Sequence, residues 1–232
     1  MGGIKDALSV LVGAYGDHPE LSLRCVDSLT KFAENREKLQ IHVGCSECSD
    51  RVVQELSDRY ANGQIDSLFL CRKNINKDPM MRILLQRVET EYLLWLDDDS
   101  HFIEKGWDTA LFDFISRETD LDVAGHIYFC HRDESYTNFV KNRPWFRGRE
   151  PEDDRVFFAT GGCWLARTSF LLSHGFPDWK MVKKLDDLLL GDLCFQQNGN
   201  LKDFSHDKAI MDKVKISDGD RRGAGEGDDG WR

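Results

Sequence analysis

The chain has 232 residues, of which 41% are hydrophobic and 31% charged, and its formal net charge is −10. This composition is typical of a globular protein with a sizeable core, and the acidic balance disfavours broad nonspecific binding to nucleic acid. No apolar run approaches the length of a membrane-spanning helix, and the N-terminus leads through Asp6 directly into an apolar strand, which does not fit a signal peptide. We therefore expect a cytoplasmic protein.

Strand-like and helix-like segments alternate through the first half of the chain. In order, they are a strand at 8–15, a helix from Pro19, a strand at 39–45, a helix around 52–60, a strand at 67–71, a helix that Asp78 is expected to cap, a strand at 92–96, a helix around 107–115 and a strand at 123–130. Nearly continuous apolar strands separated by amphipathic helices indicate a mainly parallel α/β sheet that helices cover on both faces. Ligands bind such sheets beyond the carboxyl ends of the strands.

The second half of the chain is less regular. Residues 131–154 carry many charges with little periodicity, so we expect a long loop there. A strand at 155–160 follows, then Gly161-Gly162, a short helix before Gly175 and a further helix over 186–199. The polar segment 217–232 is expected to be a flexible tail, which leaves 1–216 as a single domain.

The seven cysteines are odd in number, and most lie within apolar runs. This pattern favours reduced thiols that pack as small core residues. Cys45 and Cys48 have C-x-x-C spacing, but no second pair of Cys or His follows at a zinc-site distance. Packing is the simpler interpretation, and a redox dithiol is the alternative.

Three adjacent carboxylates, Asp97, Asp98 and Asp99, follow the most apolar strand. They would repel one another unless a cation or strong donors compensate. Alternate residues of an extended segment point the same way, so Asp97 and Asp99 can face one ligand. Oxygen ligands favour Mg²⁺ or Mn²⁺, which commonly bridge carboxylates and substrate phosphates. A solvated acidic turn is the alternative.

The segment YLLWLDDDS resembles the D-x-D region of GT-A glycosyltransferases, especially those of family 2. The opening segment LSVLVGAYGDHPELSLRCVDSL, the strand FATGGCWLAR and the turn at 175–178 resemble further motifs of that family in the expected order. The resemblance covers most of residues 7–205. It implies a Rossmann-like nucleotide-sugar-binding fold and a metal-dependent, inverting transfer of a hexose or pentose from a nucleotide sugar.

The resemblance also suggests roles for individual residues. By position, Asp97 contacts the nucleotide and Asp99 binds the metal ion, with Asp97 as a second carboxylate near it and His206 as a candidate third ligand. The candidate nucleotide-contacting residues are Tyr15, Asp17, Arg82 and Asp97. An aromatic at a strand end, an exposed helical arginine and a polar surface histidine are the plainer alternatives. The second strand ends in Gly-Cys-Ser-Glu rather than in the acids with which the family often reads the base, so the nucleotide base stays open.

Asp186 and Asp187 occupy the place of the family's acidic pair at the start of a helix. An inverting transfer needs a carboxylate that takes the proton of the acceptor hydroxyl. Asp187 is the first candidate for this base and Asp186 the second. The alternative is a pair of acids that stabilises the helix N-terminus through the helix dipole.

The segment 141–149 contains four basic residues and two adjacent aromatics without one acid. Such a loop can grip a phosphate-bearing acceptor, nucleic acid included. Neighbouring acids can instead neutralise it, or its aromatics can pack internally.

Two other functions compete with sugar transfer. A nucleotidyltransferase shares the fold and acidic site, but residues 13–17 lack the basic residue of its phosphate loop. A non-catalytic module that binds sugar or nucleic acid is the other.

Overall fold

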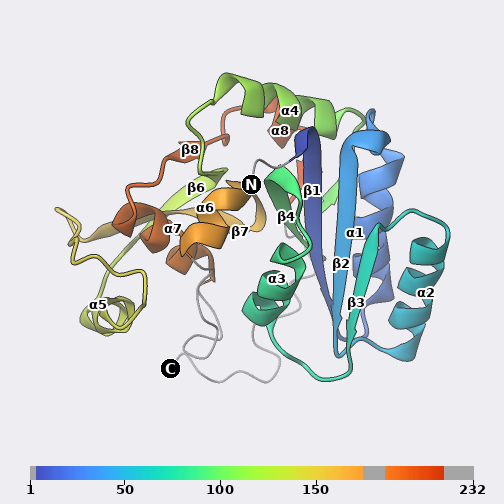
Figure 1. Ribbon diagram of the computed structural model, residues 1–232, viewed down its shortest axis with the longest axis horizontal. Coiled ribbons are helices and arrows are strands. Elements are labelled where there is room, and N and C mark those ends of the chain that lie inside the picture. Colours follow the sequence, from blue (N-terminus) through green and yellow to red (C-terminus); the bar gives the residue numbers. More distant parts are fainter. Residues whose placement is uncertain (1–3, 175–185, 217–232) are drawn as a thin grey trace.

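The computed structural model describes residues 4–174 and 186–216. Its centre is a sheet with strand order β3-β2-β1-β4-β7-β6-β8, between two layers of helices (Figure 1). The strands of this sheet are β1 (Ile4–Tyr15), β2 (Leu39–Ser46), β3 (Ser67–Cys71), β4 (Thr90–Asp97), β6 (Val123–His131), β7 (Arg155–Arg167) and β8 (Leu201–Asp203). A second, two-stranded sheet pairs β5 (His101–Phe102) with β9 (Val214–Lys215).

The helices are α1 (Pro19–Lys31), the 3-10 helix η1 (Arg36–Lys38), α2 (Asp50–Ala61), α3 (Lys77–Leu85), α4 (Trp107–Arg117), α5 (Glu134–Lys141), α6 (Thr168–His174), α7 (Asp186–Gln196) and α8 (Lys208–Met211). None of them, within the described ranges, is long and apolar enough to cross a membrane.

The main sheet is mostly parallel, which confirms the predicted fold class. β1 runs parallel to β2 and β4, β2 to β3, and β6 to β8, whereas β7 is antiparallel to both β4 and β6. The carboxyl ends of β1 to β4 therefore meet along one edge, the lower edge in Figure 1. The three acids at the end of β4 lie at this edge.

The core follows from strand alternation. In β4, Leu94 and Leu96 face the helix layer that includes α1, α2 and α4, while Leu93 and Trp95 face the layer of α3, α6 and α7. All four side chains are fully buried. Because both faces are covered, a strand must be apolar at every position, and this explains the uninterrupted run YLLWL.

The structure corrects the expectation for the second half of the chain. The segment 131–154 contains helix α5, whose N-cap Asp133 accepts a hydrogen bond from the backbone N–H of Tyr136 at 2.7 Å. Its apolar face is short, and the many charges around it concealed the helical period. Strand β7 is also longer than expected, because Gly161-Gly162 lies within it instead of ending it. The last long helix ends at Gln196, three residues before the predicted end.

The third helix begins two residues earlier than the cap prediction requires. Its N-cap is Asn76, in a left-handed conformation with φ 66°, and Lys77 is the first helical residue. Asp78 is buried inside the first turn, so the expectation that it caps the helix was wrong. The turn at 175–178 and the tail at 217–232 lie outside the described residues.

Candidate active site

A tight turn follows β4, closed by a hydrogen bond from the N–H of Ser100 to the carbonyl of Asp97 at 2.9 Å. Within it, Asp98 is buried, and its Oδ2 accepts hydrogen bonds from the N–H of Tyr15 at 3.1 Å and from the hydroxyl of Ser22 at 3.0 Å. The middle acid therefore joins β4 to β1 and α1. Asp97 and Asp99, on either side of it, stay partly exposed.

Asp97 is held by two donors from the α3 side of the sheet. The indole Nε1 of Trp95 donates to Oδ1 at 2.6 Å. The Lys77 ammonium lies 2.8 Å from Oδ1 and 3.0 Å from Oδ2, and it also donates to the carbonyl of Gly161 at 3.2 Å. The same ammonium is 5.6 Å from the centre of the Trp95 ring. Lys77 therefore compensates part of the negative charge of this turn.

The position of α3 brings Lys77 to this edge. The helix packs so closely on β2 that a Cβ at Gly44 would lie 2.1 Å from Sδ of Met80. Any larger residue there would force the Met80 side chain to move, so the glycine lets the helix approach this closely. Sequence reasoning missed Lys77, and the only signal was a basic residue at the start of a helix beyond a parallel strand.

The acids suit a hard divalent cation, because carboxylate oxygens are the ligands that Mg²⁺ and Mn²⁺ prefer. In the part of the chain that the structure describes, no three or more His, Cys, Asp or Glu side chains gather so that they could hold a metal ion. His206 is exposed in the turn after β8, so it does not complete such a group with Asp97 and Asp99. An ion at these two acids would take its other ligands from substrate phosphates and water, as Mg²⁺ commonly does.

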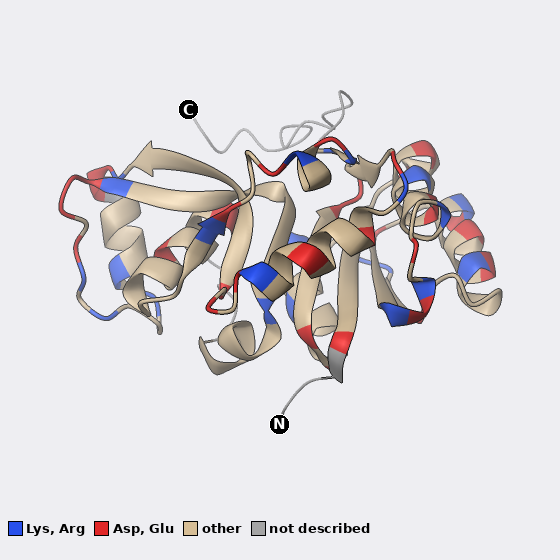
Figure 2. Ribbon diagram, turned by 90° about the horizontal axis from the view of Figure 1, so that it is seen from above, with Lys and Arg blue, Asp and Glu red and all other residues tan. Residues whose placement is uncertain are grey.

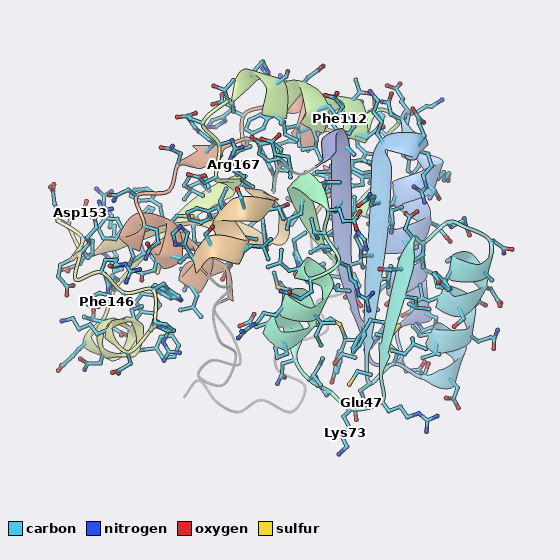
Figure 3. All side chains as sticks on the ribbon, viewed as in Figure 1. Glu47, Lys73, Phe112, Phe146, Asp153 and Arg167 are labelled. Carbon is cyan, nitrogen blue, oxygen red and sulfur yellow. The ribbon has the colours of Figure 1, made fainter. Side chains whose placement is uncertain are left out.

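Two of the candidate nucleotide contacts, Tyr15 and Asp17, lie at the end of β1, beside the end of β2. Tyr15 is 44% exposed. Asp17 accepts a 2.6 Å hydrogen bond from the hydroxyl of Ser49, the N-cap of α2, and the N–H of Ser49 donates to the carbonyl of Gly16 at 3.1 Å. The loops after β1 and β2 are thereby fastened together. Glu47 and Lys73 mark the same edge in Figure 3.

Arg82 lies on the exposed face of α3, between the buried Met81 and Leu84. The helical spacing that predicted the core face of α3 is confirmed by these neighbours. It is Lys77, one and a half turns earlier, whose side chain reaches Asp97.

The candidate base lies in helix α7, which packs against the second half of the sheet. α7 packs on β7 at Gly191, where a Cβ would lie 2.2 Å from the carbonyl oxygen of Phe157. Asp187, in the first turn of α7, accepts a hydrogen bond from the N–H of Leu188 at 2.8 Å. The Tyr136 hydroxyl donates to the carbonyl of Leu188 at 3.1 Å, and the pKa of Tyr136 is raised by burial first and by nearby acids that include Asp187. The side chain of Asp186 lies outside the description.

Much of the 141–149 loop packs internally. Arg143 is buried, with its guanidinium 4.1 Å from the centre of the Phe139 ring, and Trp145 is 3% exposed. Arg149 lies over the ring of Phe195 and donates to its carbonyl.

The remaining cations of the loop differ in their surroundings. Lys141 pairs with Glu150 at 3.1 Å, whereas the Arg147 side chain is exposed. Basic and acidic residues are interspersed in the view of Figure 2, rather than gathered on one basic face. Arg147 is therefore the basic residue of the loop best placed to meet a ligand.

All seven cysteines carry free thiols. Cys45 is buried at the end of β2, and a hydrogen bond with Cys48 together with burial raises the pKa of its thiol. A raised pKa disfavours the reactive thiolate, which agrees with packing more than with redox chemistry.

The family model of glycosyl transferase family 2 matches residues 9–174, more than half of the chain. The protein belongs to glycosyl transferase family 2. No curated protein sequence matches it significantly.

Solved structures show that this family 2 member has the GT-A fold. It is similar to S. aureus TarS 1-349, with TM-score 0.60, 17% identity, and coverage of 84% of this chain and 57% of that chain. It is also similar to the mannosyltransferase PcManGT from Pyrobaculum calidifontis in complex with GDP-Man and Mn²⁺, with TM-score 0.61, 15% identity and coverage of 84% and 54%. For GalNAc-T7 with UDP, GalNAc and Mn²⁺ the TM-score is 0.61, the identity 14% and the coverage 84% and 41%. The family 2 chain thus spans little more than half of these chains at most, and identities this low show the fold alone.

Proposed function

We propose that this protein transfers a sugar from a nucleotide-sugar donor to an acceptor hydroxyl, with a divalent cation held by Asp97 and Asp99. The observation that carries the proposal is the turn after β4, where one buried acid fastens the turn and the two acids beside it stay partly exposed. Its place at the carboxyl edge of a mostly parallel sheet is where such folds bind nucleotides. The solved structures with GDP-Man and with UDP and GalNAc contain Mn²⁺, which supports a metal-dependent donor site here.

The division of roles follows the sheet. A divalent cation supplies a Lewis acid that stabilises the negative charge of the departing nucleoside diphosphate. Asp97 and Asp99 hold it, and Tyr15 and Asp17, at the end of β1, contact the nucleoside. Arg82 reaches the diphosphate from the exposed face of α3. His206 serves as a third ligand only if its turn moves, because it lies apart from the acids in the described residues.

The acceptor occupies the other half of the edge. Asp187, with Asp186 as the second candidate, takes the proton from the acceptor hydroxyl in an inverting displacement. Its support is its place in the first turn of α7, which packs against β7, the strand whose Gly161 carbonyl binds Lys77 beside Asp97. Arg147 meets a phosphate on the acceptor. Family membership favours this function over nucleotidyl transfer.

A screen of nucleotide sugars by thermal unfolding, with and without Mn²⁺, tests the proposal. A ligand that binds only the native state stabilises it by about 2.7 kcal/mol at a hundred times its dissociation constant. We expect one class of nucleotide sugar to raise the unfolding temperature in the presence of Mn²⁺, and to lose most of that effect with EDTA. A chain that no nucleotide sugar stabilises, with or without the cation, would contradict the proposal.

A further inference from the structure

Lys77 is a cation placed where a helix disfavours one. It is the first residue of α3, and helix N-termini carry partial positive charge that favours acids. Its ammonium nevertheless contacts both carboxylate oxygens of Asp97, at 2.8 and 3.0 Å. Attraction to Asp97 therefore offsets an unfavourable position on the helix.

The backbone around Lys77 is also unusual. Asn76, immediately before it, has φ 66° and ψ 172°, a conformation that is costly for a residue with a side chain. The loop before it is fixed by the hydroxyl of Ser46, which accepts from the N–H of Ile75 at 3.0 Å, and by Asn74, which accepts from the N–H of Asn76 at 2.8 Å. This strained entry into α3 sets the direction from which Lys77 approaches the acids.

Lys77 touches the same carboxylate that the proposed function assigns to the divalent cation and the nucleotide. Both oxygens of Asp97 already have a donor, since Trp95 binds Oδ1 at 2.6 Å and Lys77 lies near both. A divalent cation that approaches Asp97 then meets a positive charge already in contact with both oxygens, so the two cations compete for the carboxylate. A nucleoside diphosphate offers that ammonium other anionic oxygens within the same edge.

We propose that Lys77 is an internal counter-ion that couples cation binding to nucleotide binding. Without nucleotide it holds Asp97 and competes with the divalent cation. With nucleotide it transfers to the diphosphate and leaves Asp97 to the cation. Cation and nucleoside diphosphate therefore bind cooperatively, and each binds weakly without the other. The transfer of Lys77 to the diphosphate rests on the proposed function. The competition between Lys77 and the cation for Asp97 rests on the contacts of Lys77 alone.

Removal of the ammonium should have opposite effects on the two ligands. Lys77→Met keeps a long apolar stem beside Trp95 but leaves Asp97 without its cation. Mn²⁺ alone should then bind about ten times more tightly, while a nucleoside diphosphate without metal should bind about ten times more weakly. The coupling between the two should fall within the usual range, about 5- to 150-fold, to the part that direct contact between the cation and the phosphates supplies. General damage to the site would weaken both ligands, so a gain in Mn²⁺ affinity separates this role from a structural one.

The test is calorimetric titration of the full chain with Mn²⁺ alone, with UDP or GDP alone, and with each in the presence of the other. Lys73→Met is the matched control, because Lys73 is an exposed lysine on the loop at the same edge and its side chain points outward from the ribbon (Figure 3). Lys77→Arg keeps the charge and should retain most of the coupling. This second variant tests the inference if Lys77→Met folds poorly.

Weaker or unchanged Mn²⁺ binding in folded Lys77→Met, or the same changes in Lys73→Met, would overturn the inference. Failure of UDP and GDP to bind the unmodified chain would instead count against the proposed function, and the Mn²⁺ arm would still decide whether Lys77 competes for Asp97.

Discussion

The buried carboxylate of Asp98 accepts the backbone N–H of Tyr15 at 3.1 Å, so the carboxyl ends of β4 and β1 are fastened together next to the two accessible acids. The same oxygen accepts the hydroxyl of Ser22, which adds helix α1 to the junction. Three consecutive acids of identical type thus have different environments, one buried and two partly exposed.

Asp98→Ala should destabilise the protein. The change leaves the N–H of Tyr15 and the hydroxyl of Ser22 without this acceptor, and a buried donor without a partner costs about 1–3 kcal/mol. Urea unfolding measures the loss. A variant as stable as the unmodified chain would show that Asp98 does not fasten the turn.

Asp99→Ala should weaken ligand binding and leave the stability of the protein nearly unchanged. Asp99 is partly exposed, so we expect the free energy of unfolding to change by less than about 1 kcal/mol. Binding of a nucleoside diphosphate in the presence of Mn²⁺ should fall to the level seen with EDTA. Calorimetry with the folded variant decides this, and undiminished metal-dependent affinity would remove Asp99 from the metal site.

Asp187→Asn should lower turnover by roughly a hundredfold or more, which is the usual scale for the loss of a general base. Donor affinity should barely change, because the group acts on the acceptor in the transition state. Steady-state kinetics with a fixed acceptor, together with donor titrations, separate the two effects. Asp186→Asn is the comparison: if that variant shows the larger loss, the role of base moves to Asp186.

Arg147 and Arg143 make a matched pair for the 141–149 loop. Arg147→Ala should weaken the use of a phosphate-bearing acceptor and flatten its salt dependence, and leave stability and donor binding unchanged, because the side chain is exposed. Arg143→Ala should lower stability instead, since the guanidinium is buried over Phe139. Acceptor kinetics at several salt concentrations test the first. An acceptor affinity that does not depend on salt would exclude the phosphate contact.

Asp192 should make stability depend on pH. Burial raises its pKa to about 6 from 3.8, although Arg132 lies 3.6 Å away and acts in the other direction. Since the folded state holds this proton more tightly than the unfolded state, the contribution of Asp192 is greatest below about pH 4 and is lost as the pH rises through about 6. A shift of this size corresponds to about 3 kcal/mol.

The measurement is the difference in free energy of unfolding between the unmodified chain and Asp192→Asn from pH 4 to pH 7. The subtraction removes the contributions of Asp120, Asp153 and Asp203, whose lowered pKa values act in the opposite direction. We expect the unmodified chain to lose stability relative to the variant as the pH rises. A flat difference would mean that Asp192 titrates normally.

The sheet could be predicted from the sequence because its buried strands are also runs of apolar residues in the sequence. The five strands predicted in the first half became β1, β2, β3, β4 and β6, and β3 has the predicted bounds of 67–71. The helical period likewise located α1 at Pro19. By contrast, α5 is a short helix of eight residues among many charges, so its periodicity was too brief to detect.

The site was less accessible to sequence reasoning than the fold. The acidic run indicated a site at the end of β4, but three adjacent aspartates look alike in sequence, and only the hydrogen bonds from Tyr15 and Ser22 separate Asp98 from its neighbours. Lys77 was missed because its contact with Asp97 joins residues 20 positions apart. Such contacts depend on how α3 packs against the sheet, which no local pattern records.

The most direct test of the central claim is the release of nucleoside diphosphate from the nucleotide sugar that best stabilises the protein. Donor hydrolysis needs no acceptor, so it isolates the cation and the acids after β4 from the unknown second substrate. We predict release in the presence of Mn²⁺, loss of release on chelation, and loss in the folded Asp99→Ala variant. Release that continues at the same rate with the chelator and in the variant would contradict a metal-dependent donor site at Asp97 and Asp99.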